Sequence, residues 1–389
     1  MKLPTIPPIY LDYHATTPVD PRVAAVVLHA MTTAFGNANS TEHVYGEMAA
    51  ALVTGARREV AELVDADPEG VHFTSGSSES IQLAVAHAVT GRRQGPLRVA
   101  LTTVEHRAVL DAVALHQRRG EVAVRWLPVD DQAGLDMAAL EAACRDGVDL
   151  VCVMAANNEV GTLYPVEAVV QIAAQAGART LIDTTQAAGR IPMQAAAWGI
   201  TYLTVSAHKI YRPKGVGALV VPPGLDIRPS SGSIPGTGDG SPNVPGIVGL
   251  GEACRLRRLE MADDEPRMAA QRDRLEALLV ADIDGVVVNG DRERRLRNNL
   301  HVSVPDVPND AVVGRLRRHV ALSTGAACSS ASQTPSHVLR AMGLSEALQE
   351  GALRIGTGKF TTDEEIERAA VYIAQAVADT RRAMGRLRT

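Results

Sequence analysis

The sequence predicts an α/β protein with a mostly parallel central sheet, helices on both faces of that sheet, and a smaller α+β domain. Between about residues 68 and 221, short β-branched runs alternate with longer amphipathic stretches, which is the pattern of βαβ units. The pattern ends at a Gly-, Pro- and Ser-rich stretch, 222–246, which we expect to be a long loop. At 389 residues, of which 46% are hydrophobic, the chain is long enough for two such domains.

Seven strands are expected in the first part of the chain. They are the apolar runs at 70–74, 98–103, 121–128, 149–156, 179–183, 201–206 and 216–221. The segments between them, such as 108–119 and 165–177, carry apolar residues at helical spacing, and the second ends in Gly as a helix C-terminus should. This alternation predicts parallel pairing with crossover helices on both faces.

The second part mixes helices with isolated strands. We expect a long helix at roughly 245–281, strands at 286–289, 299–304 and 353–356, two further helices before the last strand, and a final helix at 362–386. We place the large domain at 18–260 and the small α+β domain at 261–389 together with 1–17.

Composition excludes several classes of protein. A net charge of −5 and a pI near 6.1 argue against a main role in holding nucleic acid, and the arginine clusters at 292–297 and 381–388 are interpreted as solvated. The first twenty residues have no apolar core behind a basic start, so no signal peptide is predicted, and no run is apolar enough to span a membrane. Four cysteines without a CxxC pair predict no disulfide framework and no metal site, and the expected location is the reducing cytoplasm.

Polar residues follow three of the predicted strands, where open α/β sheets bind ligands. The stretch Thr74–Glu79 offers backbone N–H groups, hydroxyls and a helix N-terminus to a phosphate, although the same residues could form an ordinary helix cap. Asp183 ends the strand at 179–183, and Lys209 follows the strand at 201–206. Lysine is scarce, because the chain has only Lys2, Lys209, Lys214 and Lys359. A buried amine, a carboxylate and phosphate donors together predict pyridoxal 5'-phosphate, with Lys209 forming a Schiff base.

The arrangement of these residues resembles that in the cysteine desulfurases. Those enzymes belong to the class V aminotransferase group of fold-type I pyridoxal-phosphate enzymes. The resemblance covers nearly the whole sequence. It rests on YLDYHATTPVDPRV, FGNANS, FTSGSSES, TVEHRAVLD, NNEVGT, IDTTQAAGR, SAHKIYRPKGVGAL, TGAACSSASQTPSHVLRAMG and LRIGTGKFTTDEEI.

The resemblance implies roles for individual residues around the cofactor. Lys209 binds the cofactor aldehyde, Asp183 the pyridine nitrogen and Gln186 the ring hydroxyl. His106 stacks on the ring and is a candidate acid or base, where the alternative is an ordinary imidazole at a helix start. The phosphate-binding positions are Ser77, Ser78, Ser206 and His208.

The resemblance also implies how the substrate is held. Asn158 and Arg354 match the positions that bind the substrate carboxylate, with Arg354 as a bidentate fork. The alternatives are a turn residue for Asn158 and an exposed guanidinium for Arg354.

Cys328 is the expected nucleophile. It lies among small residues that suit an accessible thiol, whereas Cys152, Cys144 and Cys254 fall in strand or helix segments where packing explains them. By the resemblance, its thiolate attacks the sulfur of L-cysteine, L-alanine leaves, and a persulfide remains for an acceptor protein. The length of this segment resembles the branch with the long catalytic loop.

The chain departs from the family at three places. The family's glycine-rich loop is replaced by residues 230–241, although Ser241 falls at the position of a Thr that reaches the cofactor phosphate of the neighbouring subunit. Arg212 stands where the family has Gly, and Ser77, Ser78 and Glu79 replace its GATE motif. The expected assembly is a homodimer.

The leading hypothesis is therefore a cysteine desulfurase that delivers sulfur to an acceptor protein. The resemblance leaves iron–sulfur cluster assembly, tRNA thiolation and DNA phosphorothioation open as pathways, with no direct contact with nucleic acid or membrane expected. Two alternatives are another class V enzyme, such as an aminotransferase or a selenocysteine lyase, and a weakly active structural partner in a sulfur-transfer complex. A transaminase needs no thiol, which argues against it.

Overall fold

The computed structural model describes residues 7–92, 94–227, 240–324 and 336–387. Its large sheet has seven strands in the order β2-β8-β7-β6-β5-β3-β4. The strands are β2 (Val71–Thr74), β3 (Leu97–Thr102), β4 (Val122–Leu127), β5 (Leu150–Met154), β6 (Arg179–Asp183), β7 (Tyr202–Ser206) and β8 (Gly217–Val220). Only β8 is antiparallel to its neighbours, so the prediction of a mostly parallel sheet is confirmed.

The direction of the strands decides where a site can form. Because β8 is antiparallel to both β2 and β7, these two strands run the same way. The strands β3, β5 and β6 are linked to β7 by parallel pairing. The carboxyl ends of β2, β3, β5, β6 and β7 therefore meet at one edge of the sheet.

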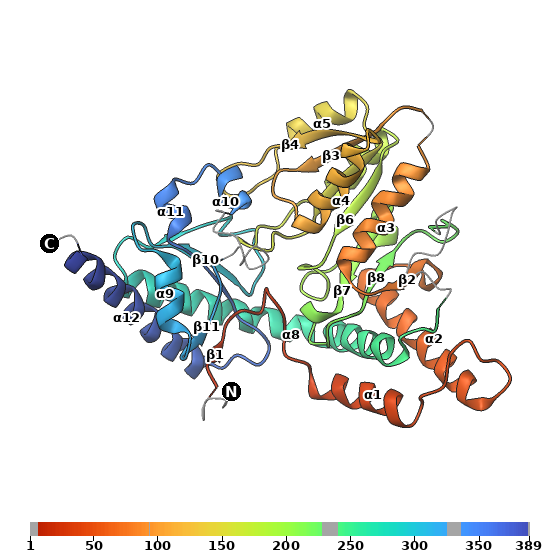
Figure 1. The fold of residues 1–389 in the computed structure, drawn as a ribbon, viewed down its shortest axis with the longest axis horizontal. Coiled ribbons are helices and arrows are strands. Elements are labelled where there is room, and N and C mark those ends of the chain that lie inside the picture. The colour runs from red at the N-terminus through yellow and green to blue at the C-terminus, as the bar shows by residue number, and fades with distance from the viewer. Residues whose placement is uncertain (1–6, 93, 228–239, 325–335, 388–389) are drawn as a thin grey trace.

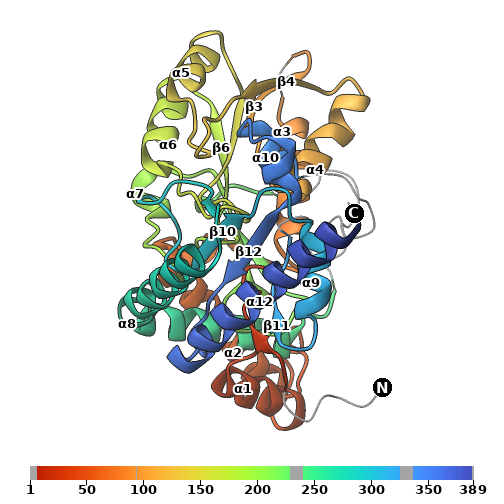
Figure 2. The same ribbon diagram turned by 90° about the vertical axis from the view of Figure 1, so that its left-hand side faces the viewer.

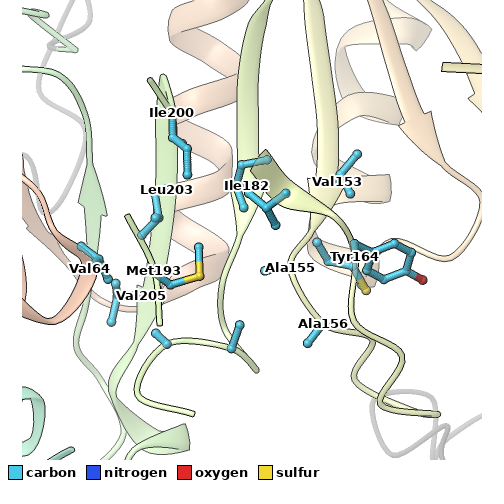
Figure 3. Packing of buried hydrophobic residues seen from close by; sticks show 14 of the residues in the cluster. Val64, Val153, Ala155, Ala156, Tyr164, Ile182, Met193, Ile200, Leu203 and Val205 are labelled. Carbon is cyan, nitrogen blue, oxygen red and sulfur yellow. The ribbon is translucent and has the colours of Figure 1, made fainter. Parts of the chain in front are cut away.

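Helices cover both faces of this sheet, as predicted. They are α1 (Pro21–Thr32), α2 (Val44–Val64), α3 (Ser77–Thr90), α4 (Arg107–Arg118), α5 (Met137–Arg145), α6 (Val166–Gln175) and α7 (Ala195–Trp198), with 3-10 turns at Pro68–Gly70 and Ala207–Lys209. One core packs α2, α5 and α6 on the sheet, and part of it around Ile182 and Met193 is drawn in Figure 3. A second core joins α3 and α4 to the other face.

The long helix α8 (Val244–Asp282) runs from α2 to the small sheet, as Figure 1 shows. Asn243 caps its first turn by accepting from the N–H of Gly246 at 3.0 Å. Gly251 lets α8 approach α2 closely, because a Cβ there would lie 2.5 Å from Ala56 Cα. Backbone contact of this kind fixes how α8 crosses α2.

The small sheet has the antiparallel order β12-β10-β9, and a separate parallel pair joins β1 to β11. The remaining elements are β1 (Ile9–Tyr10), β9 (Val287–Val288), β10 (Asn299–Ser303), β11 (Val320–Ala321), β12 (Ala352–Gly356), α9 (Asn309–Leu316), α10 (His337–Ala341), α11 (Glu346–Glu350) and α12 (Asp363–Leu387). Figure 2 shows α9 and α12 in front of this sheet. Together they enclose a hydrophobic cluster of their own. Within the described ranges, no helix is long and apolar enough to cross a membrane.

Candidate functional site

The structure places several of the predicted site residues at the carboxyl edge of the large sheet. Asp183 is the last residue of β6 and Ser206 the last of β7. His106 lies between β3 and α4, Asn158 follows β5, and Ser77 opens α3 after β2. Residues that are far apart in sequence thus share one edge because the strands that carry them run in the same direction.

Lys209 lies against the N-terminal segment of the chain. Its Nζ donates to the carbonyl oxygen of Ala15 at 2.9 Å and also to that of His14. Its own carbonyl oxygen accepts from Arg190 at 3.2 Å. Tyr211, two residues further on, has a left-handed φ of +69°, and its N–H donates to Thr17 Oγ1 at 2.7 Å. The turn that presents the Lys209 amine is therefore held from both sides.

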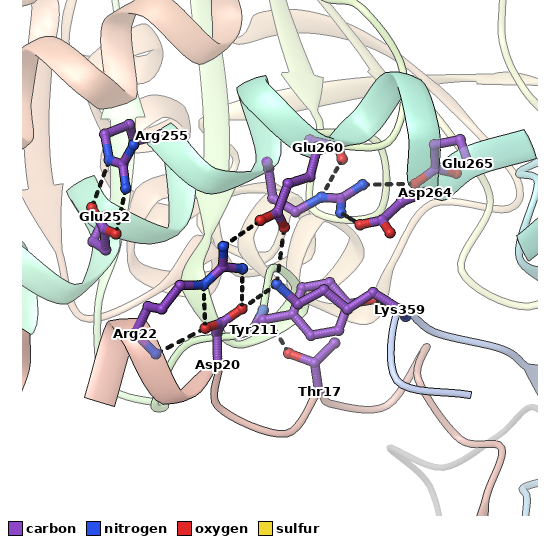
Figure 4. A network of polar contacts seen from close by, with 12 residues as sticks. Thr17, Asp20, Arg22, Tyr211, Glu252, Arg255, Glu260, Asp264, Glu265 and Lys359 are labelled. Carbon is purple, nitrogen blue, oxygen red and sulfur yellow. Dashed lines mark hydrogen bonds and ion pairs between the residues drawn. The ribbon is translucent and has the colours of Figure 1, made fainter. Parts of the chain in front are cut away.

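An ionic network lies beside this turn, with Asp20 and Lys359 buried at its centre and Arg22 at its exposed rim (Figure 4). Lys359 pairs with Asp20 and, at 3.2 Å, with Glu260, and its ammonium lies 4.8 Å from the centroid of the Tyr211 ring. Arg22 joins Asp20 and Glu260 from the other side. The hydrogen bond from Arg22, followed by that from Lys359, holds the pKa of Asp20 well below its usual range against the opposing effect of burial. The network fixes the N-terminal segment to α8.

Asp183 keeps one carboxylate oxygen available. Its Oδ1 accepts from Thr185 Oγ1 at 2.6 Å, from the Thr185 N–H at 3.0 Å and from Thr204 Oγ1 at 2.9 Å. No hydrogen bond within the described residues uses Oδ2. A protonated ring nitrogen is a suitable donor to this second oxygen.

Gln186 contacts His14, a residue that the sequence interpretation missed. The His14 ring donates from Nδ1 to Gln186 Oε1 at 3.2 Å, and Gln186 Nε2 donates to the His14 carbonyl at 3.0 Å. Asn299 Nδ2 donates to His14 Nε2 at 3.2 Å. Burial, together with the charges of Arg190 and Arg354, lowers the pKa of His14 well below its usual value, so the ring is neutral. The stretch YLDYHATT was noted as a motif, yet nothing in it indicated contacts so distant in sequence.

His106 caps helix α4 through one nitrogen of its ring. Nδ1 accepts from the N–H of Ala108 at 3.1 Å. A neutral ring therefore carries its proton on Nε2. The helix-start alternative and the acid or base role are compatible, because they use different atoms of the ring.

The predicted phosphate-binding groups have unused donors. No side chain of the described residues caps α3, so N–H groups of its first turn have no such partner beside Ser77 and Ser78. Ser206 is 3% exposed, and its hydroxyl has no hydrogen-bond partner in the described part of the chain. Gly217 permits this arrangement, since a Cβ there would lie 2.8 Å from Gly76 Cα. This donor set fits a phosphate.

His208 stands beside these groups. Its Nδ1 lies 3.3 Å from Thr16 Oγ1. Burial, with the charges of Lys209 and Lys214, lowers the pKa of His208 to about 4, so the ring is neutral near pH 7. A neutral ring of this kind can take part in hydrogen bonds without adding a charge.

Arg354 and Asn158 are brought together. Arg354 is 3% exposed, its Nη1 donates to the Asn158 carbonyl at 3.0 Å, and its Nη2 contacts Asp12 at 3.2 Å. Its Nε is buried and has no hydrogen-bond partner among residues 7–92, 94–227, 240–324 and 336–387. The turn is made by Asn157, whose Oδ1 accepts from two backbone N–H groups, so the Asn158 amide is not used for the turn. The exposed alternative for Arg354 is wrong, because its guanidinium is buried. Asn158 is a turn residue, as its alternative held, but its side-chain amide makes none of the hydrogen bonds that Asn157 supplies to the turn.

Cys328 lies outside the described residues. The other cysteines, Cys144, Cys152 and Cys254, are buried and unpaired, as their segments predicted. Burial raises the pKa of each of these thiols, which keeps them protonated. Among the four cysteines, those within the described ranges are therefore unsuited to nucleophilic attack.

All three departures from the family fall at least partly within the described structure: Ser77, Ser78 and Glu79 open α3, Arg212 follows β7, and Ser241 ends the replaced loop. Arg212 is 3% exposed, donates to the Pro213 carbonyl at 2.6 Å, and lies against Gly249 of α8. Burial lowers the pKa of Arg212 to about 10. Ser241 is exposed and accepts from Asn37 Nδ2 at 3.3 Å.

The arginine cluster at 292–297 is largely neutralised by acidic partners. Arg295 pairs with Glu276 at 2.6 Å, Arg294 pairs with Asp291 at 2.8 Å, and Arg292 also contacts Glu276. Arg292, Arg294 and Arg297 are exposed, as a solvated cluster requires, but the interpretation is wrong for Arg295, which is buried beside Glu276.

Comparison with known proteins gives consistent results. Residues 9–369 match the family described as aminotransferase class-V. The chain is 41% identical over 379 residues to cysteine desulfurase IscS of Anaeromyxobacter dehalogenans, covering 96% of this chain and 93% of that protein. A solved NifS-like protein superposes with a TM-score of 0.87 at 31% identity, covering 95% and 99% of the two chains. A structure described as SspA in complex with cysteine gives 0.78 at 27% identity, covering 91% and 100%.

Proposed function

The chain belongs to the aminotransferase class-V family and is a cysteine desulfurase, and on this premise we propose which of its residues carry the reaction. Members of the family are pyridoxal-phosphate enzymes. In this chain the cofactor would be held by Lys209, Asp183, Gln186 and His106 around its ring. Its phosphate would be held by Ser77, Ser78, Ser206 and His208. The observation that carries this assignment is the set of unused donors and acceptors at one sheet edge, Asp183 Oδ2 among them.

The bound cofactor supplies an electron sink for the amino acid joined to it. Asp183 Oδ2 would keep the ring nitrogen protonated, and His106 Nε2 would hold or release a proton on the ring face. Arg354 and Asn158 would orient the substrate carboxylate, for which the buried guanidinium provides a fixed positive charge. These contacts would hold L-cysteine with its sulfur directed away from the carboxylate anchor.

Cys328 would complete the reaction as a thiolate nucleophile. An S–S bond forms between its sulfur and that of L-cysteine, while the C–S bond of the substrate breaks. The electron pair of that bond, with a proton, stays on the former β-carbon, so L-alanine leaves and Cys328 carries the persulfide. An acceptor protein would then take the outer sulfur, and the same persulfide could serve each of the three pathways named above.

We propose a homodimer formed through an exposed apolar face on α1, α2 and the segment between them. Its residues are Leu28, Met31, Phe35, Val44, Tyr45 and Met48, which are 39–65% exposed. Ser241 borders this face through Asn37, which supports the expectation that it reaches the neighbouring subunit's cofactor phosphate. Phe35→Asp should give monomers by light scattering, while Trp126→Glu, a control at an exposed aromatic residue on β4, should remain dimeric.

We also propose the division into a large domain, 18–260, and a small domain, 261–389 with 1–17. The separate hydrophobic cluster of the small sheet supports it, since its members lie at 9–11 and 275–377. A cytoplasmic location would keep the Cys328 thiol reduced.

The assignment is tested by measuring alanine and sulfide together after adding L-cysteine and a reductant. Wild type should release them in equal amounts, and Cys328→Ser and Lys209→Ala should release neither. Alanine formation by Cys328→Ser at the wild-type rate would remove the cysteine from the mechanism. Release of alanine without sulfide would favour the alternative class V reactions.

A further inference from the structure

Both ends of the segment that carries Cys328 are attached to residues beside the candidate substrate site. At the N-terminal end, Ser323 pairs with Arg354 through backbone hydrogen bonds of 2.7 and 3.2 Å. At the C-terminal end, Ser336 donates from Oγ to Glu159 Oε2 at 2.6 Å, in a buried contact. Glu159 is the neighbour of Asn158 in sequence, so each end contacts a residue that binds the substrate carboxylate or adjoins one that does.

A second contact holds the same C-terminal end. His337 Nε2 donates to the carbonyl oxygen of Glu105 at 2.9 Å. Glu105 precedes His106, and its own carboxyl Oε1 accepts from Thr102 Oγ1 at 2.7 Å and from the Met154 N–H at 3.0 Å. Ser336 and His337 therefore bind the neighbours of Asn158 and His106.

Glu159 is a rigid anchor. Its N–H donates to Asn157 Oδ1 at 2.9 Å, and its carbonyl accepts from Asn299 Nδ2 at 2.9 Å. Ser336 has a further role, because its Oγ accepts from the N–H groups of Val338 and Leu339 and so caps α10. The hydroxyl of Ser336 thus joins helix α10 to the turn that carries Asn158.

We propose that Ser336 is a positioning residue for sulfur transfer, acting through its hydrogen bond to Glu159. This inference rests on the proposed role of Cys328. Cys328 follows Ser323 by five positions and precedes Ser336 by eight, so the chain from Ser323 can reach at most about 18 Å. Fixing both ends raises the effective concentration of the thiol at the substrate sulfur, as tethering does in general.

The test separates this contact from the helix cap. Ser336→Asp keeps an N-cap acceptor for α10 but places a second carboxyl group against Glu159 in a buried position. The rate of alanine formation should fall at least about ten-fold. The shift in the cofactor spectrum on adding L-cysteine should remain, because Arg354 and Lys209 are unchanged. Ser336→Thr, which keeps the hydroxyl, should retain the wild-type rate.

A double variant tests whether Ser336 acts through Glu159. In the Ser336→Asp/Glu159→Gln double variant, the new amide can donate to the new carboxylate, and most of the lost rate should return. Ser345→Asp, the same change at the exposed N-cap of α11, is the control and should match wild type. A wild-type rate for Ser336→Asp, or equal loss in the single and double variants, would overturn the proposal. Absence of alanine from wild type would instead refute the proposed role of Cys328.

Discussion

The buried carboxyl group of Glu105 predicts how the free energy of unfolding changes with pH. The side chain is fully buried between the ends of β3 and β5, and its Oε2 has no hydrogen-bond partner in the part of the chain that the structure describes. Burial raises the pKa of Glu105 to about 8 from its ordinary value of 4.5, against the opposing hydrogen bonds from Thr102 and Met154. In the folded protein the carboxyl is therefore protonated up to about pH 8, whereas in the unfolded chain it ionises above 4.5.

The direction of the pH effect follows from this difference. As pH rises from 4.5 to about 8, the unfolded state releases a proton that the folded state retains, so the free energy of unfolding decreases. The free energy of unfolding falls by about 1.4 kcal/mol for each pH unit in this window, and by roughly 5 kcal/mol over the whole window. Glu105→Gln cannot ionise in either state, and its Oε1 can still accept from Thr102 and Met154.

Denaturant unfolding of wild type and Glu105→Gln, compared at pH 5, 6, 7, 8 and 9, tests this reasoning. The stability of the variant relative to wild type should rise by about 1.4 kcal/mol per pH unit and level off above pH 8. Glu69→Gln, at an exposed position, should show no such trend. A constant difference between Glu105→Gln and wild type across the range would refute the claim that Glu105 is held protonated.

Two further predictions concern the substrate and the cofactor. Arg354→Lys should raise the KM for L-cysteine about ten-fold with a smaller change in kcat, because a point charge replaces a planar fork; a steady-state comparison that left KM unchanged would contradict the carboxylate role. Asp183→Asn should lower kcat at least about 100-fold, since the negative charge facing the ring nitrogen is lost. Its melting temperature should stay near that of wild type, because an amide oxygen still accepts from Thr185 and Thr204; wild-type turnover would contradict the assignment.

The sequence predicted the sheet because its strands and helices follow from local patterns. Alternating apolar runs identified the strands, and polar residues at their ends, such as Asp183, predicted which edge of the sheet would carry the candidate site. The direction of β8 was not predicted, because the run Gly217–Val220 has the same composition whichever way it runs. Hydrophobic periodicity specifies burial and leaves strand direction open.

Contacts between segments that are far apart in sequence could not be predicted from the sequence pattern either. His14 meets Gln186 across 172 positions, and Ser336 meets Glu159 across 177. Neither pair has a signature in spacing, since each depends on how the N-terminal segment and the small domain pack on the large sheet. Asn158 is a further example. The sequence NNEVG is suited to a turn, but only the structure shows that the side chain of Asn157, and not that of Asn158, makes the hydrogen bonds of that turn.

Mass spectrometry of the enzyme after one addition of L-cysteine, without reductant, tests the central claim most directly. Peptides containing each of the four cysteines should be compared after alkylation of the intact protein. One additional sulfur should appear on the Cys328 peptide, with none on those of the buried Cys144, Cys152 and Cys254. Extra sulfur on another cysteine, or an unmodified Cys328 accompanied by alanine, would contradict the account.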